Sequence, residues 1–308
     1  MRLLFMGTPD FAVPSLEALI AAGHTVCGVF CQPDKPKGRG MKLTPPPVKV
    51  RAQAHGIPVF QPVKLRDGTA LAQIRALAPE LIVVAAYGRI LPQEILDAPS
   101  LGCINVHSSL LPKYRGAAPI NWAILNGDGE TGVTIMHMAA ALDAGDIIAQ
   151  TATLIGPDET APQLTARLAD LGGRLLVETV TKIENGTAAR IPQEDGKVTL
   201  APMLGRELSP MDFTRTAQAL HDQVRGLTPW PAAVTVVSGV RCKVLATAVE
   251  TGTGSAGAVL EAGNAGLLCA CGEGTALRIL ELQPDGGKRM RSADYLRGHP
   301  VAVGELLG

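Results

Sequence analysis

Short apolar runs alternate with segments of helical periodicity through the first 185 residues of the chain. Strands are predicted at residues 3–7, 25–31, 57–61, 81–87, 102–107, 131–138 and 146–155. Helices are predicted at residues 10–22, 67–78, 118–126 and 160–185. The run LIVVAAY at residues 81–87 is continuously apolar, which is typical of a central strand covered on both faces. This alternation predicts a doubly wound, Rossmann-like α/β domain.

Two segments interrupt this pattern. Residues 32–47, QPDKPKGRGMKLTPPP, are rich in proline, glycine and lysine and are predicted to form a loop without regular structure. Residues 186–207 are polar and irregular, as expected for a linker.

The C-terminal part of the chain has a different pattern. A helical stretch is predicted at residues 210–225, and short β-type runs separated by glycine-rich turns follow from residue 233. That spacing is typical of a small β-barrel. We therefore expect an α/β domain at residues 1–189, a linker at 190–206 and a smaller barrel at 207–308.

The composition changes this picture in two respects. Only 3% of the 308 residues are aromatic, so aliphatic side chains must fill the cores. Lys plus Arg and Asp plus Glu both number 28, and a chain without net charge is unsuited to indiscriminate nucleic-acid binding. Any nucleic-acid contact is therefore expected from local basic clusters.

The six cysteines form no paired metal-binding motif, and we expect them to be buried, reduced thiols. No apolar run approaches membrane-spanning length, and the N-terminus lacks the layout of a signal peptide. These patterns predict a soluble, cytoplasmic protein.

Three polar residues are candidates for chemistry. Asn105 and His107 lie two apart at the carboxyl end of a predicted strand, so their side chains project from one face. Open α/β sheets place their active sites at this end of the strands. Asp143 lies in the short loop between the last two strands predicted for this domain, where it can approach His107.

Asparagine, histidine and aspartate together offer a donor for a developing oxyanion, a titratable relay and a carboxylate that orients the relay. No serine or cysteine has an elbow or triad context, which favours direct transfer between bound substrates. Each residue also has an ordinary structural interpretation: a strand-end cap for Asn105, a satisfied core group for His107 and a turn for Asp143. Spacing alone leaves both interpretations open.

Longer motifs resemble one known family. NVHSSLLPKYRGAAP at residues 105–119, TGVTIMHM at 131–138 and LDAGD at 142–146 are similar to the folate-dependent formyltransferases. PDKPKGRGMKLTPPPVK at 33–49 and LQPDGGKRMRSADYLRG at 282–298 resemble the members of that family that formylate methionyl-tRNA. The resemblance covers nearly the whole chain.

The resemblance implies that Asn105, His107 and Asp143 are the catalytic trio. It implies that the folate-contacting loop consists of Ser109, Leu110, Leu111 and Pro112. It also implies that Tyr87 and Gly88 lie near the pterin pocket. The implied co-substrate is 10-formyltetrahydrofolate, without a metal, and the implied acceptor is the α-amine of initiator methionyl-tRNA. The second domain is implied to be an OB-like barrel that helps to hold the tRNA, and the protein is implied to be a monomer.

The resemblance also selects basic residues for tRNA binding. The implied contacts are Lys35, Lys37, Arg39, Lys42, Lys288 and Arg289. In the second cluster, which also contains Arg291 and Arg297, some charges are expected to pair with Asp285 or Asp294 instead.

Three other functions remain as alternatives. The first is a formyltransferase for another amine, such as glycinamide ribonucleotide or an amino sugar nucleotide. The second is a folate-binding module without catalysis, against which the intact trio counts. The third is a nicotinamide-dependent oxidoreductase, which is disfavoured because GTGSAG at residues 252–257 has no following helix and is predicted to be a turn.

Overall fold

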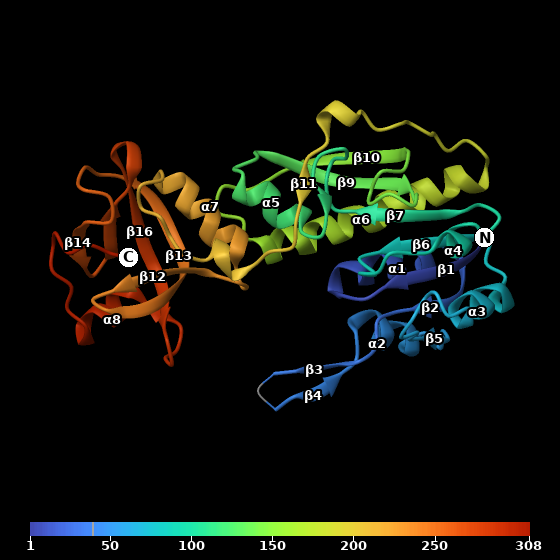
Figure 1. Ribbon diagram of the computed structural model, residues 1–308, viewed down its shortest axis with the longest axis horizontal. Coiled ribbons are helices and arrows are strands. Elements are labelled where there is room, and N and C mark those ends of the chain that lie inside the picture. The colour runs from blue at the N-terminus through green and yellow to red at the C-terminus, as the bar shows by residue number, and fades with distance from the viewer. Residues whose placement is uncertain (39) are drawn as a thin grey trace. The chain divides into compact units, whose positions relative to one another are not determined.

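The computed structural model describes residues 1–38 and 40–308 of the chain (Figure 1). They form two compact units. The N-terminal unit comprises Met1–Pro119, Thr131–Thr153 and Thr165–Ala201. The C-terminal unit comprises Ile120–Glu130, Leu154–Leu164 and Pro202–Gly308. Two short internal segments of the chain thus belong to the C-terminal unit.

A mostly parallel sheet forms the centre of the N-terminal unit. Its strands are β1 (Arg2–Gly7), β2 (Thr25–Phe30), β5 (Val59–Phe60), β6 (Leu81–Ala85), β7 (Cys103–His107), β9 (Glu130–His137) and β10 (Ile147–Leu154). Their order is β10-β9-β7-β6-β1-β2-β5. β1 pairs in parallel with β2 and β6, and β6 with β7, whereas β7 and β9 are antiparallel. The predicted doubly wound architecture is confirmed, and its winding reverses between β1 and β6.

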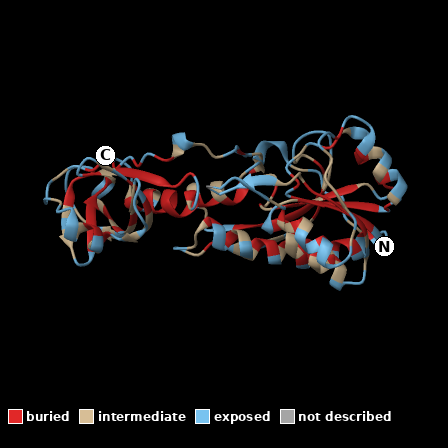
Figure 2. Cartoon of the chain, turned by 90° about the horizontal axis from the view of Figure 1, so that it is seen from below, coloured by how far each residue is buried: buried red, intermediate tan, exposed pale blue. Residues whose placement is uncertain are grey.

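Helices cover both faces of this sheet. They are α1 (Val13–Ala21), α2 (Pro47–Ala54), α3 (Thr69–Leu77), α4 (Gln93–Leu96) and α6 (Ala161–Glu184). Leu4 of β1 belongs to a buried cluster with Ile74 of α3 and Ile95 of α4. Gly172 of α6 approaches β7 so closely that a Cβ there would lie 3.0 Å from Val106. Burial on two faces explains the apolar composition of the central strands, which are red in Figure 2.

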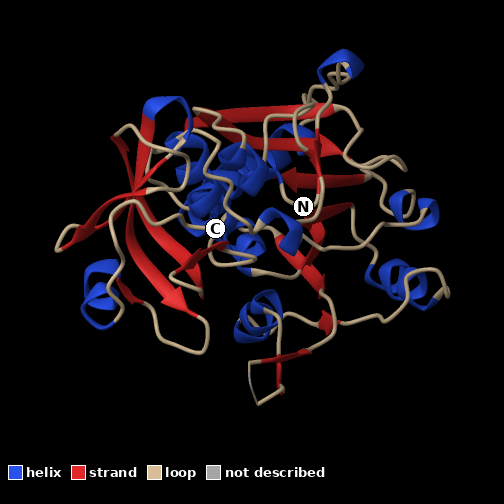
Figure 3. Cartoon of the chain, turned by 60° about the vertical axis from the view of Figure 1, so that its left-hand side comes forward, coloured by secondary structure: helices blue, strands red, loops and turns tan. Residues whose placement is uncertain are grey.

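The segment at residues 32–47 differs from its prediction. β3 (Lys35–Lys37) and β4 (Lys42–Thr44) form an antiparallel hairpin, in which Lys37 lies opposite Lys42. Figures 1 and 3 show this hairpin extending beyond the main sheet. The prediction of an irregular loop was wrong because main-chain pairing forms this hairpin without the apolar pattern from which strands are predicted. The short α2 was also missed, since only Val48 and Ala52 are buried on it.

The C-terminal unit contains an antiparallel sheet with α7 (Ala217–Leu227) packed on it. The strands are β12 (Ala233–Val237), β13 (Val240–Thr251), β14 (Val259–Gly263), β15 (Gly266–Ala270), β16 (Thr275–Pro284) and β17 (Met290–Arg291). Their order is β12-β13-β16-β15-β14, with β17 paired to β16. α8 (Ser292–Gly298) follows, and α5 (Pro119–Leu125) packs its Leu125 close to Gly226 of α7.

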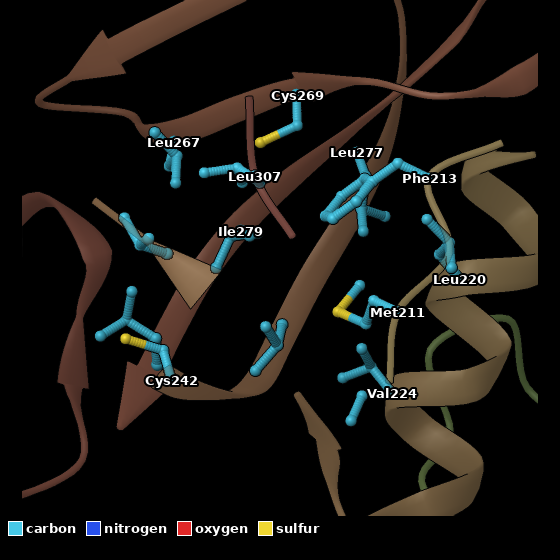
Figure 4. Close-up of a cluster of buried hydrophobic side chains, with 14 of the residues drawn as sticks. Met211, Phe213, Leu220, Val224, Cys242, Leu267, Cys269, Leu277, Ile279 and Leu307 are labelled. Atoms are coloured by element: carbon cyan, nitrogen blue, oxygen red, sulfur yellow. The ribbon is translucent and has the colours of Figure 1, made fainter. Parts of the chain in front are cut away.

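The helix predicted at residues 210–225 begins later than expected. Thr216 is its N-cap, and the hydroxyl oxygen of this threonine accepts a hydrogen bond from the Ala219 N–H. The preceding residues pair instead with β12, where Met211 N donates to Val234 O. The apolar side chains before Thr216 face the core of the sheet. Their spacing in the sequence resembled that of the apolar face of a helix. Figure 4 shows Met211 and Phe213 in that core beside Leu220 and Val224 of α7.

No helix in the described ranges is long and apolar enough to cross a membrane.

Candidate active site

The carboxyl end of β7 presents two polar side chains. Asn105 and His107 share one face because strand residues alternate, and in the register of β9 they lie opposite Met136 and Thr134. His107 is buried, whereas Asn105 is half-buried. Within residues 1–38 and 40–308, no protein group is hydrogen-bonded to the Asn105 side chain. Its amide is therefore free to donate to a ligand at this edge of the sheet.

The orientation of the His107 ring follows from one contact. Its Nε2 atom lies 2.9 Å from the main-chain oxygen of Tyr114. A carbonyl oxygen only accepts hydrogen bonds, so Nε2 carries the hydrogen and donates. The Nδ1 atom is therefore the one available for chemistry.

Asp143 faces this nitrogen. The distance from His107 Nδ1 to Asp143 Oδ2 is 3.8 Å, and both side chains are largely buried. The same carboxylate oxygen accepts a hydrogen bond of 2.9 Å from the Gly116 N–H. The structure thus brings the predicted histidine and aspartate together, although they are far apart in the sequence.

The loop that carries Asp143 is tightly turned. Asp143 has a φ of 48°, which is unusual for a residue other than glycine. At Gly145 a Cβ would lie only 1.8 Å from the main-chain oxygen of His137, so glycine is required there. The loop formed by the LDAGD motif therefore directs the Asp143 side chain toward β7.

Residues of the predicted linker also contact this site, although no sequence pattern indicated this. β11 (Leu200–Ala201) pairs with β8 (Arg115–Gly116), and Thr199 Oγ1 accepts a hydrogen bond from Tyr114 N. Gln193 contacts the loop of Asp143. A polar, irregular stretch carries no periodic signal, so nothing in the pattern distinguished these residues from an exposed linker.

The segment predicted to contact folate is fixed by hydrogen bonds. The Ser109 hydroxyl donates to Lys113 O at 2.7 Å, and Ser109 is completely buried. Thr134 Oγ1 donates to Ser109 O and accepts from Leu111 N. Leu111 is buried, whereas Leu110 and Pro112 are half-buried, so Leu110 and Pro112 are the more accessible side chains of this loop.

Tyr87 and Gly88 follow β6 at the point where the winding of the sheet reverses. The Tyr87 ring is buried in the core beside α3 and α4, and its burial raises the pKa of the phenol to about 12. Gln32 Nε2 donates to both main-chain oxygens, at 3.0 Å to Tyr87 and 3.3 Å to Gly88. The side chain of Tyr87 therefore belongs to the core, and the main chain after it lines the edge.

Most of the basic side chains that the structure describes near the hairpin are exposed and are not engaged in an ion pair. Lys35, Lys37 and Lys42 are exposed on β3 and β4, and Lys35 Nζ donates to Gln32 Oε1 at 2.8 Å. Lys49 is different, because it pairs with Asp34 at 2.8 Å. Hydrogen bonds from the side chains of Gln61, which has the larger effect, and Lys49 lower the pKa of the Asp34 carboxyl. Arg39 lies outside the described residues.

The second basic cluster is partly neutralised. Arg289 Nε donates to Glu281 at 2.6 Å, and Arg297 pairs with Asp294 at 3.1 Å. Asp285 pairs with Arg241 at 3.5 Å. Lys288 is exposed and has no ion-pair partner among the described residues. Pairing with Asp294 was anticipated, whereas the partner of Arg289 was not.

All six cysteines are free and buried. Among the described residues, no group of three His, Cys, Asp or Glu side chains is arranged to hold a metal ion.

Comparison with known proteins defines the class. The family model for formyl transferase matches residues 1–180, and the model for the formyl transferase C-terminal domain matches residues 204–300. The chain belongs to the formyl transferase family.

Particular relatives span its whole length. Methionyl-tRNA formyltransferase of Citrifermentans bemidjiense is 49% identical over 308 residues, which is 100% of this chain and 96% of the relative. Methionyl-tRNA formyltransferase of Moorella thermoacetica is 50% identical over 310 residues, with 100% and 99% covered.

Solved structures share the fold at low identity. An N-formyltransferase from Helicobacter canadensis, in complex with folinic acid and dTDP-3-aminofucose, is 19% identical with a TM-score of 0.69 and covers 91% of this chain and 98% of its own. HypX from Aquifex aeolicus, in complex with tetrahydrofolic acid, is 18% identical with a TM-score of 0.63, over 96% of this chain. This chain spans 47% of the length of HypX.

Proposed function

We propose that this chain transfers the formyl group of 10-formyltetrahydrofolate to the α-amine of initiator methionyl-tRNA. The observation that carries the proposal is the approach of Asp143 to His107 beside the free amide of Asn105, at the sheet edge where α/β enzymes bind ligands. The full-length relatives at about half identity, whose printed name states this acceptor, support the choice of tRNA.

The proposed mechanism begins with attack of the neutral amine on the formyl carbon. A free α-amino group titrates at roughly 7.7–8.0, so a minority of it, roughly a fifth to a third, is neutral near physiological pH. A new carbon–nitrogen bond forms while the electron pair of the carbonyl π bond moves to oxygen. The product of this step is a tetrahedral oxyanion, whose charge must be stabilised.

Asn105 and His107 supply that stabilisation in the proposal. The Asn105 amide donates one hydrogen bond to the oxyanion. Since the hydrogen on His107 Nε2 is held by Tyr114, a second hydrogen bond must come from a proton on Nδ1. Asp143 Oδ2 faces that nitrogen at 3.8 Å.

Collapse of the intermediate completes the transfer. The amine nitrogen loses a proton, which Asp143 carries, and N10 of the folate gains a proton as the bond between it and the formyl carbon breaks. The oxygen electron pair restores the carbonyl, leaving a formylated amine and tetrahydrofolate. No covalent enzyme intermediate is required, consistent with the absence of a nucleophile elbow in the sequence.

Each predicted domain has a proposed role. Residues 1–189 form the folate-binding catalytic domain, in which the folate lies along the loop at 109–112 and the main chain at Tyr87 and Gly88. Residues 207–308 form an OB-like barrel that helps to bind tRNA, joined to the first domain by residues 190–206. The antiparallel order of the C-terminal sheet and its helix α7 support this assignment.

The proposed tRNA contacts are the basic hairpin and the second cluster. Because the chain has no net charge, binding of the phosphate backbone depends on such local clusters. The exposed Lys35, Lys37 and Lys42 support the hairpin as a contact surface, and Arg39 is proposed from the sequence alone. Lys288 is the better candidate of the second cluster, since Arg289 is paired with Glu281.

One experiment tests the proposed function directly. Purified protein is incubated with formyl-labelled 10-formyltetrahydrofolate and, separately, methionyl-tRNA, glycinamide ribonucleotide, an amino sugar nucleotide or no acceptor. Label is expected in the methionyl-tRNA fraction alone. Label in the nucleotide fractions would identify another acceptor, and folate binding without turnover would identify a non-catalytic module; either result would overturn the proposal.

A further inference from the structure

The segment predicted as a linker contains a side chain that is hydrogen-bonded to the Asp143 loop. Gln193 is half-buried, and its Nε2 donates to two main-chain oxygens of that loop, Asp143 O and Gly145 O, each at 2.8 Å. Both N–H groups of the Gln193 side-chain amide therefore donate to the main-chain carbonyls on either side of Ala144.

Arg115 determines which end of the Gln193 amide faces the loop. Its Nε and Nη2 atoms donate to Gln193 Oε1 at 3.0 and 2.7 Å. A guanidinium has no acceptor, so the oxygen of the glutamine must face Arg115 and the NH₂ must face the loop. Arg115 lies next to Gly116, the donor to Asp143 Oδ2. Gly116 of β8 thus binds the side chain of Asp143, and its neighbour Arg115 orients the glutamine that binds the main chain of the loop.

The Asp143 loop has little else to fix it. Residues 139–142 are all exposed, including Leu142 at 61%. The hydrogen bond from Ala144 N to Ala141 O is long, at 3.4 Å. The main chain of Asp143 is also in the left-handed region, which is unfavourable for aspartate in isolation. The hydrogen bonds from Gln193 to the main chain therefore act together with the bond from Gly116 N to Asp143 Oδ2 in maintaining this conformation.

We propose that Gln193 is a positioning residue for the transfer reaction, which acts by holding Asp143 at its distance from His107. The inference rests on the proposed function, since it assigns Gln193 to that same site. The predicted linker is then part of the active site through residue 193. Thr199 supports the assignment, because its contact with Tyr114 N orients the residue whose carbonyl binds His107 Nε2.

The test compares variants that remove the same kind of bond in different places. Gln193→Ala removes both donors. Gln193→Glu keeps the size and the acceptor for Arg115 but places a carboxylate oxygen against two carbonyl oxygens. Gln223→Ala is the matched control, because Gln223 Nε2 also donates to two main-chain oxygens, Leu208 O and Pro210 O, within the C-terminal unit.

Both Gln193 variants are expected to lose about 10–100-fold in kcat, because misplacement of a reacting group by about 1 Å has effects of that size. KM for each substrate is expected to change by less than about threefold, as for an interaction used in the transition state. Gln223→Ala is expected to lower the melting temperature while kcat stays within about twofold. Normal kcat in Gln193→Glu would overturn the inference, as would an equal kcat loss in Gln223→Ala.

A double-mutant cycle separates positioning from general stabilisation. In an Asp143→Ala background, Gln193→Ala is expected to reduce the residual kcat by less than about twofold, because its effect acts through residue 143. The same 10–100-fold loss in both backgrounds would contradict the inference. Failure of the proposed function is distinct, since the unmodified protein would then not formylate methionyl-tRNA at all.

Discussion

His107 Nδ1 lies 3.8 Å from Asp143 Oδ2, which is too far for a direct hydrogen bond. The other ring nitrogen is already bonded to a carbonyl oxygen, and the carboxylate is already bonded to Gly116 N. Each partner is therefore oriented independently of the other. The pair is arranged around a position at which a substrate proton is exchanged in the proposed reaction.

The charge of Asp143 is predicted to matter more than its shape. Asp143→Asn keeps an oxygen that accepts from Gly116 N but removes the negative charge that faces His107. We expect kcat to fall by about 10²–10⁴-fold, the usual range for a general acid–base group. Steady-state formylation of methionyl-tRNA measures this, with circular dichroism to establish folding. A folded variant with unchanged kcat would remove Asp143 from the chemistry.

Asn105→Ala is predicted to remove one donor to the oxyanion. We expect a loss of about 10²–10³-fold in kcat with little change in melting temperature, because the amide has no protein partner to lose. Asn185→Ala, at the exposed end of α6, is the control and is expected to be normal. Near-normal turnover by folded Asn105→Ala would show that the oxyanion is stabilised elsewhere.

The basic hairpin is predicted to act through phosphate contacts. For the double variant Lys37→Gln, Lys42→Gln, KM for methionyl-tRNA should rise while KM for the folate is unchanged. The plot of log(kcat/KM) against log[salt] should become shallower by about 0.7–0.9 per lost contact. Lys182→Gln, an exposed lysine of α6, should behave as wild type. Equal salt slopes for the wild type and the double variant would exclude the hairpin as a phosphate-binding surface.

Arg278 is predicted to stabilise the C-terminal sheet. Its Nη2 donates to Glu250 at 2.9 Å and to Glu261 at 2.7 Å, and its own side chain is 11% exposed. Arg278→Met should cost about 1–2 kcal/mol at neutral pH, a modest value because both carboxylates are partly exposed. Chemical denaturation of each variant measures this difference.

The stabilisation by Arg278 should depend on pH in a defined direction. The hydrogen bond from Arg278 lowers the pKa of Glu250 below its ordinary value. Stability from this pair is therefore complete above the unfolded pKa, about 4.3, and is lost as pH falls through the lower folded value. The difference between wild type and Arg278→Met should shrink in acid. A difference that grows in acid would contradict this assignment.

The cysteines are predicted to be unreactive in the folded protein. Burial raises the pKa of every thiol, to about 11 for Cys31 and Cys271 and about 12 for Cys103. A thiol reagent at neutral pH should label almost none of the six thiols until denaturant is added. Rapid labelling of one thiol under native conditions would identify a local opening of the fold.

Local patterning predicted most of the elements. The alternation of apolar runs with helical segments identified the doubly wound sheet. The apolar runs are uninterrupted because central strands are buried on both faces. The prediction failed at the β3–β4 hairpin, where pairing depends on main-chain hydrogen bonds and turn geometry. It also misplaced the start of α7, since residues that face a sheet core resemble residues on the apolar face of a helix.

The sequence by itself determined that Asn105 and His107 share a face at the end of a strand, because alternation is a local property. It also supplied the family motifs that run through both units. The approach of Asp143 to His107, and the support from Gln193 and Thr199, were decided only by tertiary structure. These contacts join residues tens of positions apart, and hydrogen bonds between distant segments leave no period in the chain that connects them.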